Sequence, residues 1–183
     1  MIIKYLRNRQ TPVVFYLHII IILLVLSQLV LSNFIKFNEA GEISKNVINF
    51  YGTWAHFVTG LFLALITVVF ITFVLKAHGI KNYFPYLSGD YAQVVTDINQ
   101  LKQRKLPEPN PGGLASIVQG LGLGAMLLVL FSGIAWFVFW RIGYQWANVF
   151  KEAHELLTEL VIAYVIGHGG MGIVHILSTI KAQ

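Results

Sequence analysis

Four long hydrophobic runs divide the chain, and polar segments separate them. The runs cover approximately residues 12–32, 50–75, 114–140 and 151–178. Each is long enough for an α-helix that crosses the hydrocarbon core of a bilayer, which needs ~20 apolar residues. The pattern therefore predicts an all-α integral membrane protein, a four-transmembrane-helix bundle that forms a single membrane domain over residues 1–183.

The longest polar segment, 76–113, separates the second run from the third. It ends in a stretch rich in proline and glycine, 107–113, which predicts a loop. Before that stretch, Val94, Val95, Ile98 and Leu101 recur at helical spacing. We therefore expect residues 91–103 to form a surface helix that lies along the lipid headgroups with its polar side outward.

Composition agrees with a membrane location. Hydrophobic residues make up 56% of the chain and charged residues only 11%, whereas soluble domains carry about 25% charged residues. The net charge of +5 does not predict nucleic-acid binding, because the basic residues are spread over the ends of the runs. Nine Lys and Arg residues fall in the N-terminus, the 76–113 loop and the C-terminus, against four in the other two loops. The positive-inside rule then places both termini in the cytoplasm.

The absence of cysteine limits the redox chemistry that the chain can support. With no cysteine, the chain has no disulfide, no thiolate-held iron–sulfur cluster and no covalent attachment of haem through a C-x-x-C-H motif. Any haem that it holds is therefore non-covalent.

Two histidines on the fourth run are spaced for two metal centres. His154 and His168 are fourteen residues apart, which corresponds to about 21 Å of helical rise and to directions that agree within roughly 40°. His18 and His56 lie on the first and second runs. The predicted orientation places His18 near the depth of His168 on the cytoplasmic side, and His56 near the depth of His154 on the outer side. Four histidines at two depths suit two haem irons, each with two histidine ligands.

Other ligand sets remain as alternatives. Structural zinc prefers four protein ligands, and Glu155 and Glu159 do not share the helical face of His154. His175 lies seven residues after His168 and is a rival ligand. Pairing it with His154 would separate the two irons by about 32 Å along the helix, as much as the whole hydrocarbon core. This distance favours His168.

Glycines accompany the histidines. Gly167 and Gly169 flank His168, and Gly52 and Gly60 lie one turn to either side of His56. Small residues leave room for a flat macrocycle between helices. Close packing of membrane helices also enriches glycine, and both interpretations stay open.

These features together resemble the prokaryotic cytochrome b561 family, which includes the cytochrome b subunits of nickel–iron hydrogenase and formate dehydrogenase. The resemblance rests on one histidine in each of the first two runs, on His154-Glu155 and His168, and on Asn110-Pro111-Gly112-Gly113 before the third run. It implies a four-helix bundle in the bacterial inner membrane with two haem b groups. Its members carry electrons between a redox partner and a membrane quinone, ubiquinone or menaquinone.

The resemblance also implies where the quinone binds. In formate dehydrogenase subunits of this group, an Asn and a Gly before the third helix lie near the quinone and the cytoplasmic haem, and Asn110 and Gly112 match them. We expect amide groups at the start of that helix to donate to a quinone oxygen, and His175 to add a polar contact. His18 is followed by Ile19 where the family commonly has Trp, and this leaves the subfamily open.

Three functions follow as hypotheses. The first is an electron-transfer subunit that links a c-type cytochrome, a hydrogenase or a dehydrogenase subunit to quinone. The second is a self-sufficient superoxide:quinone oxidoreductase with an outer mouth near Arg141 and Lys151. The third, a remoter one, is a non-redox membrane anchor or transporter.

Overall fold

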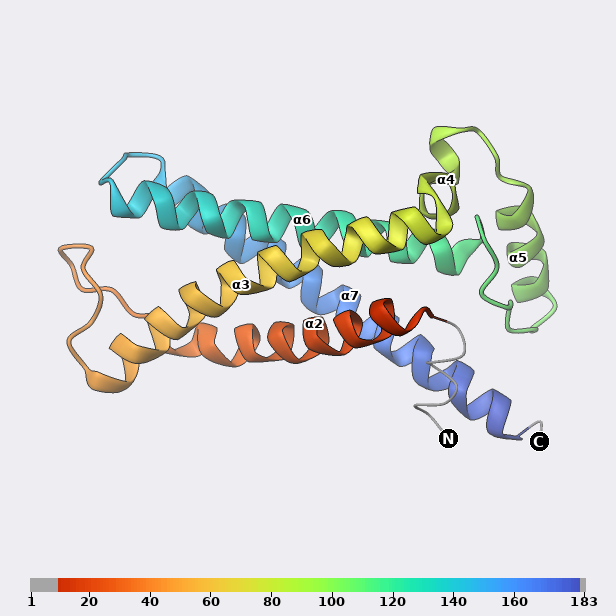
Figure 1. The fold of residues 1–183 in the computed structure, drawn as a ribbon, viewed down its shortest axis with the longest axis horizontal. Helices are drawn as coiled ribbons and strands as arrows, with labels where there is room; N and C mark the ends of the chain where they lie inside the picture. The colour runs from red at the N-terminus through yellow and green to blue at the C-terminus, as the bar shows by residue number, and fades with distance from the viewer. Residues whose placement is uncertain (1–9, 182–183) are drawn as a thin grey trace. The chain divides into compact units, whose positions relative to one another are not determined.

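The computed structural model describes residues 10–181, and this part of the chain is helical (Figure 1). An isolated antiparallel bridge between Phe37 and Ile43 closes the first loop. The elements, in chain order, are α2 (Pro12–Leu31), the 3-10 helix η1 (Ser32–Phe34), α3 (Val47–His78), α4 (Ile80–Tyr83), the 3-10 helix η2 (Pro85–Leu87), α5 (Ala92–Lys102), α6 (Leu114–Arg141) and α7 (Ala147–Lys181).

Four of these helices, α2, α3, α6 and α7, are long and apolar enough to cross a membrane. This confirms the four predicted spans. Two of them begin earlier than the hydrophobic pattern indicated, α3 at Val47 and α7 at Ala147. At α3 the side-chain oxygen of Asn46 accepts hydrogen bonds from the backbone amides of Ile48 and Asn49, at 3.0 and 3.3 Å. The helix therefore starts at a polar cap, ahead of its apolar run.

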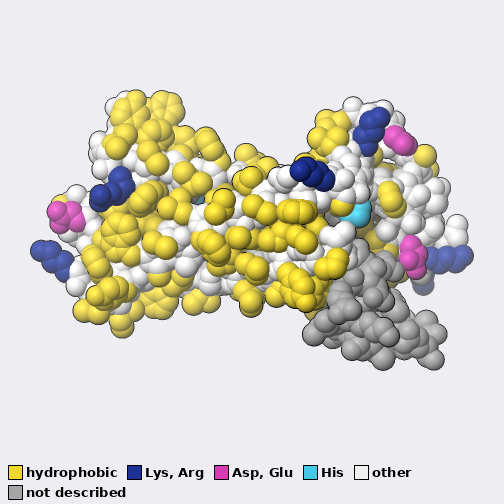
Figure 2. Space-filling model, in the orientation of Figure 1, with side chains coloured by type: hydrophobic (Ala, Val, Ile, Leu, Met, Phe, Trp, Pro, Cys, Tyr) yellow, Lys and Arg dark blue, Asp and Glu magenta, His cyan; other side chains and the backbone are white. Residues whose placement is uncertain are grey.

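Most of the spanning surface is apolar and faces outward. Only 6–28% of the residues in the most hydrophobic window of each span are buried within the chain. Figure 2 shows hydrophobic side chains covering much of the visible surface, with the visible Lys, Arg, Asp and Glu side chains lying in loops and near helix ends. Lipid must cover such a surface, because exposing so much apolar area to water would carry a large cost in free energy.

The chain divides into two compact units. The first runs to Ile71 and includes Leu130–His154; the second comprises Thr72–Val129 and the chain from Glu155 onward. The first unit therefore contains three of the four predicted ligands, His18, His56 and His154, and the second contains His168.

In the first unit, α2 packs on α3 through small and polar residues. The Gln28 side chain reaches the Thr59 hydroxyl at 2.6 Å, and a Cβ at Gly52 would collide with the Phe34 side chain. Thr53 is fully buried and donates its hydroxyl proton to the Asn49 carbonyl at 2.7 Å. These contacts bring the two helix backbones close together, as small residues do in membrane proteins.

In the second unit, polar side chains hold the start of α6. Asp97 of α5 is 1% exposed, and its carboxylate accepts hydrogen bonds from the Gln93 side chain at 2.7 Å and the Leu114 amide at 2.8 Å. It caps α6 from another helix, a role for which a negative charge is well suited. The neighbouring Tyr83 lies against Gly120, and burial raises the pKa of its phenol despite a hydrogen bond with Asn82. The helix predicted over residues 91–103 is present as α5, and its position along the lipid headgroups stays a prediction.

Candidate functional site

Two of the predicted ligands, His56 of α3 and His154 of α7, face each other in the first unit. Their ring centroids are 6.3 Å apart and the ring planes are inclined at 85°. An iron bound by two imidazole nitrogens at about 2 Å each, the distance typical of metal–histidine bonds, would place the ring centres roughly 6 Å apart. His56 is also buried. The spacing therefore fits an iron with two axial histidine ligands.

Residues of α6 surround the His154 ring. The buried Ser132 places its hydroxyl oxygen 3.3 Å from Nδ1, and the Trp136 ring lies 6.1 Å away. A Cβ at Gly133 would come within 2.8 Å of the ring carbon Cε1, so only glycine fits there. A hydrogen bond at Nδ1 leaves Nε2 available as the metal ligand, which is the usual arrangement of histidine ligands in proteins.

The Gln28 amide of α2 lies against the His56 ring. With its nitrogen toward the ring, that nitrogen lies 3.1 Å from Nδ1, 3.3 Å from Nε2 and 3.2 Å from the His56 carbonyl oxygen, and the amide oxygen accepts hydrogen bonds from the Thr59 hydroxyl at 2.6 Å and the Gly60 amide at 3.2 Å. The contact fixes the Gln28 side chain beside the imidazole and does not distinguish between the two ring nitrogens.

The third predicted ligand of this unit, His18 of α2, lies beside Gln10 and Phe70. Its Nδ1 is 3.3 Å from the Gln10 amide nitrogen, and its ring is 5.8 Å from Phe70. Within the described residues, Gln10 Oε1 and the hydroxyl oxygen of Thr67, one turn before Phe70, are buried without a hydrogen-bond partner. Buried polar atoms without partners are uncommon and are compatible with a polar group bound nearby.

The fourth ligand, His168 of α7, belongs to the second unit. Its ring stacks on Tyr164 with centroids 5.1 Å apart and planes 16° apart, and Tyr164 lies directly against Gly122. Sequence reasoning did not single out Tyr164, although its i, i+4 spacing from His168 places the two side chains on one helical face. His18 and His168 lie in different units, and their pairing stays a prediction.

At the start of α6, three backbone amides already have hydrogen-bond partners, whereas we expected amides there to be free to donate to a quinone. Gly112 adopts a left-handed φ of +69°, and its amide donates to the Asn82 side chain at 3.2 Å. The Gly113 amide donates to the Asn110 carbonyl at 3.1 Å, and Asp97 accepts from the Leu114 amide. These helix-start amides therefore have partners within the chain and are not free donors for a quinone. Asn110 is exposed and His175 half-buried.

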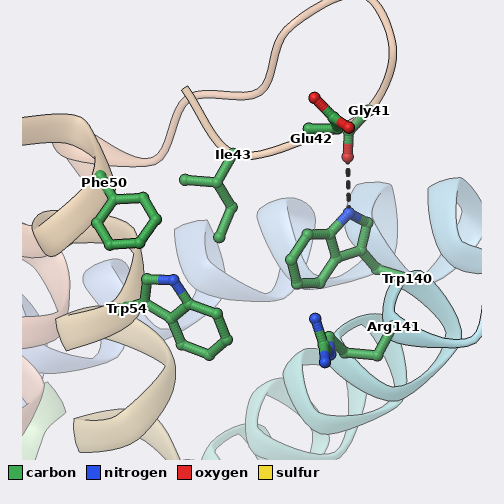
Figure 3. Close-up of a pocket in the computed structure, with 7 residues that line it drawn as sticks. All are labelled: Gly41, Glu42, Ile43, Phe50, Trp54, Trp140 and Arg141. Atoms are coloured by element: carbon green, nitrogen blue, oxygen red, sulfur yellow. Dashed lines mark hydrogen bonds between the residues drawn. The ribbon is translucent and has the colours of Figure 1, made fainter. Parts of the chain in front are cut away.

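An open hollow of about 410 Å³ lies near the C-terminal end of α6 in the first unit (Figure 3). It is lined by Gly41, Glu42, Ile43, Phe50, Trp54, Trp140 and Arg141. The Trp140 indole donates to the Gly41 carbonyl at 2.8 Å, and the Arg141 guanidinium lies 5.8 Å from the Trp140 ring centroid.

A series of aromatic rings joins this hollow to the facing histidines. The Trp140 and Phe57 centroids are 5.7 Å apart, and those of Phe57 and His56 are 6.3 Å apart. The hollow is therefore only a few ring contacts from the candidate iron site.

The metal-binding side chains of the chain and a comparison with known proteins indicate the same class of protein, a haem protein. Within residues 10–181 no three His, Cys, Asp or Glu side chains cluster as a metal site, whereas haem needs only two protein ligands. The sequence profile described as Prokaryotic cytochrome b561 matches residues 9–182. No curated protein and no solved structure matches the chain. Because the match covers nearly the whole chain, the protein belongs to the prokaryotic cytochrome b561 family: it is a multi-pass membrane cytochrome that binds haem b and transfers electrons.

Proposed function

We propose that the protein carries electrons from a donor at the outer membrane face to the quinone pool through two haem b groups. His56 and His154 would hold the outer haem, and His18 and His168 the cytoplasmic one. The observation that carries the proposal is the 6.3 Å separation of the His56 and His154 rings. Bound haem supplies reversible one-electron chemistry, which a chain without cysteine or redox-active metal clusters otherwise lacks.

The side chains around the outer pair have definite tasks in this proposal. Ser132 contacts Nδ1 of His154 and so directs Nε2 of that ring toward the iron, and Gln28 packs against the His56 imidazole. Gly133 leaves room beside the His154 ring. The apolar rings of Phe57 and Trp136 keep water away from the site, which influences the redox potential of an iron centre.

Support for the second haem comes mainly from the sequence. His154 and His168 are separated by about 21 Å of rise on one helix. A chain that uses both as ligands would carry an electron across much of the ~30 Å hydrocarbon core. The Gln10 side chain, which contacts His18 and has a buried oxygen without a partner, adds a structural argument.

The purified chain tests this function directly. We expect a reduced-minus-oxidised spectrum of b-type haem and a stoichiometry of about two haems per chain. Addition of a quinol, or of superoxide, to the same sample would then identify the donors that reduce the haem without a partner protein. The absence of a b-type signal would refute both redox functions and leave the anchor or transporter hypothesis.

The self-sufficient superoxide:quinone oxidoreductase is the second candidate function. The observation that favours it is the outer hollow, which places Arg141 beside Trp140 and a short series of rings from His56. A guanidinium at an open mouth attracts a small anion such as superoxide. Glu42 on the same wall opposes this attraction. For this reason electron transfer from a partner remains the first proposal.

We further propose that ubiquinone or menaquinone binds near the start of α6, at Asn110, Gly112 and His175. The exposed Asn110 side chain offers an amide to a quinone oxygen, and an imidazole such as that of His175 exchanges protons near neutral pH. Gly112 allows close backbone approach.

A single substitution tests that location. Asn110→Ala should slow quinol-driven haem reduction severalfold, as expected when one hydrogen bond of about 1 kcal/mol is lost. The measurement is stopped-flow haem reduction in variants with unchanged haem content. Asn99→Ala, an exposed Asn on α5, is the matched control. Equal rates in the two variants and the unmodified protein would refute this quinone location.

A further inference from the structure

The short helix α5 exposes an apolar face that the electron-transfer function does not use. Val95, Ile98 and Leu101 are 54%, 40% and 48% exposed. Thr96 and Gln103, also exposed, lie on the other side, about 160° and 140° around the helix from Ile98. An eleven-residue helix that presents so much apolar surface to water would lose stability, so another surface is expected to cover this face.

Contacts within the second unit hold α5 in one orientation. The buried Asp97 accepts a hydrogen bond from the first amide of α6, and Gln93 of α5 supports the same carboxylate. Figure 1 shows α5 running crosswise to the first turns of α6. Because α6 is a membrane span, a helix crosswise at its end runs along the membrane surface.

The charged residues around α5 complement an anionic lipid surface. Four basic residues near it are exposed: Lys81, Lys102, Arg104 and Lys105. The acidic residues of the same 76–113 segment are Asp90 and Glu108, which are exposed, and Asp97, which is buried in its hydrogen bonds. The accessible charge is therefore predominantly positive. Basic residues beside a membrane span attract anionic phospholipid headgroups.

We propose that α5 lies in the headgroup region of the bilayer, with Ile98 and Leu101 inserted among the acyl chains and the neighbouring basic residues bound to anionic lipid. The occupant is lipid rather than a second protein. The spans on either side of the loop also expose apolar side chains, and the cations beside α5 complement the charge of anionic lipid. This proposal is independent of the number and position of the haems.

The chain is well suited to a direct test because it has no cysteine. Single cysteines at Ile98, Leu101, Thr96 and Gln103 of the full chain can carry a nitroxide label in vesicles of phosphatidylcholine with or without phosphatidylglycerol. Labels at Ile98 and Leu101 should be more accessible to oxygen, which concentrates in lipid, than to a water-soluble nickel complex. Labels at Thr96 and Gln103 should show the reverse, and phosphatidylglycerol should increase the contrast.

Lysine and arginine substitutions separate the electrostatic part of the proposal. Lys102→Gln with Arg104→Gln and Lys105→Gln should remove the effect of phosphatidylglycerol while leaving the contrast in phosphatidylcholine. All four positions are exposed, so labelled variants should fold, and a single symmetric gel-filtration peak checks this. Equal access of the nickel complex to all four labels would overturn the proposal. Protection of Ile98 and Leu101 from both reagents would also overturn it, in favour of a protein partner.

Discussion

Replacement of His56 by alanine is expected to halve the haem content of the purified protein, because His56 and His154 form the pair of rings spaced for one iron. An iron that keeps only His154 loses one of its two protein ligands. The vacated volume lies beside Phe57 and Gln28, neither of which is a strong haem ligand. Haem-to-protein stoichiometry and the difference spectrum measure the outcome.

His78→Ala is the matched control for this variant. His78 lies on the same helix α3, near its other end, and is exposed, so its loss should leave the haem content unchanged. Ser132→Ala provides a graded comparison, since it keeps both imidazoles and removes only the hydroxyl beside His154 Nδ1. Two haems per chain with an unaltered spectrum in His56→Ala would show that the outer ligand assignment is wrong.

The second large effect is expected from His168→Ala, which should remove the cytoplasmic haem, whereas His175→Ala should retain both haems. The two histidines lie seven residues apart on α7 and point in nearly the same direction. A comparison of His168→Ala with His175→Ala therefore tests mainly how deep in the membrane the haem ligand lies. His168 also has the more defined environment, stacked on Tyr164 against Gly122.

His18→Ala completes this test. If His18 and His168 bind one iron, the two single variants and the double variant should have the same haem content and the same spectrum. Loss of a haem in His175→Ala alone would assign the ligand to His175. Different spectra for His18→Ala and His168→Ala would instead show that the two residues bind different irons.

The spans were predictable because a helix in lipid satisfies its own backbone hydrogen bonds, so local hydrophobicity decides where it lies. The pattern therefore located α2, α3, α6 and α7 to within a few residues. The starts of α3 and α7 were less predictable, since the Asn46 cap at α3 and the turn before Ala147 depend on local polar geometry. Helix α5 was predictable from its 3.6-residue periodicity.

The candidate site was predictable only in its residue types. Fourteen-residue spacing on one helix is a local property of the chain, and it singled out His154 and His168 without any tertiary information. The partners of these histidines come from other helices and follow no local period. Ser132 and Gln28 are an ordinary serine and glutamine in the sequence, and their roles appear only when α6 and α2 bring them to the rings of His154 and His56.

The sequence by itself determined that the protein is a membrane protein with four spans and that His154 and His168 lie fourteen residues apart on one of them, because each of these depends on composition or helical spacing. Only the tertiary structure decided that His56 and His154 face each other at 6.3 Å and that Asp97 occupies the amide expected to be free at the start of α6. The physical reason is that contacts between helices depend on the packing of side chains distant in the chain, which no local pattern records.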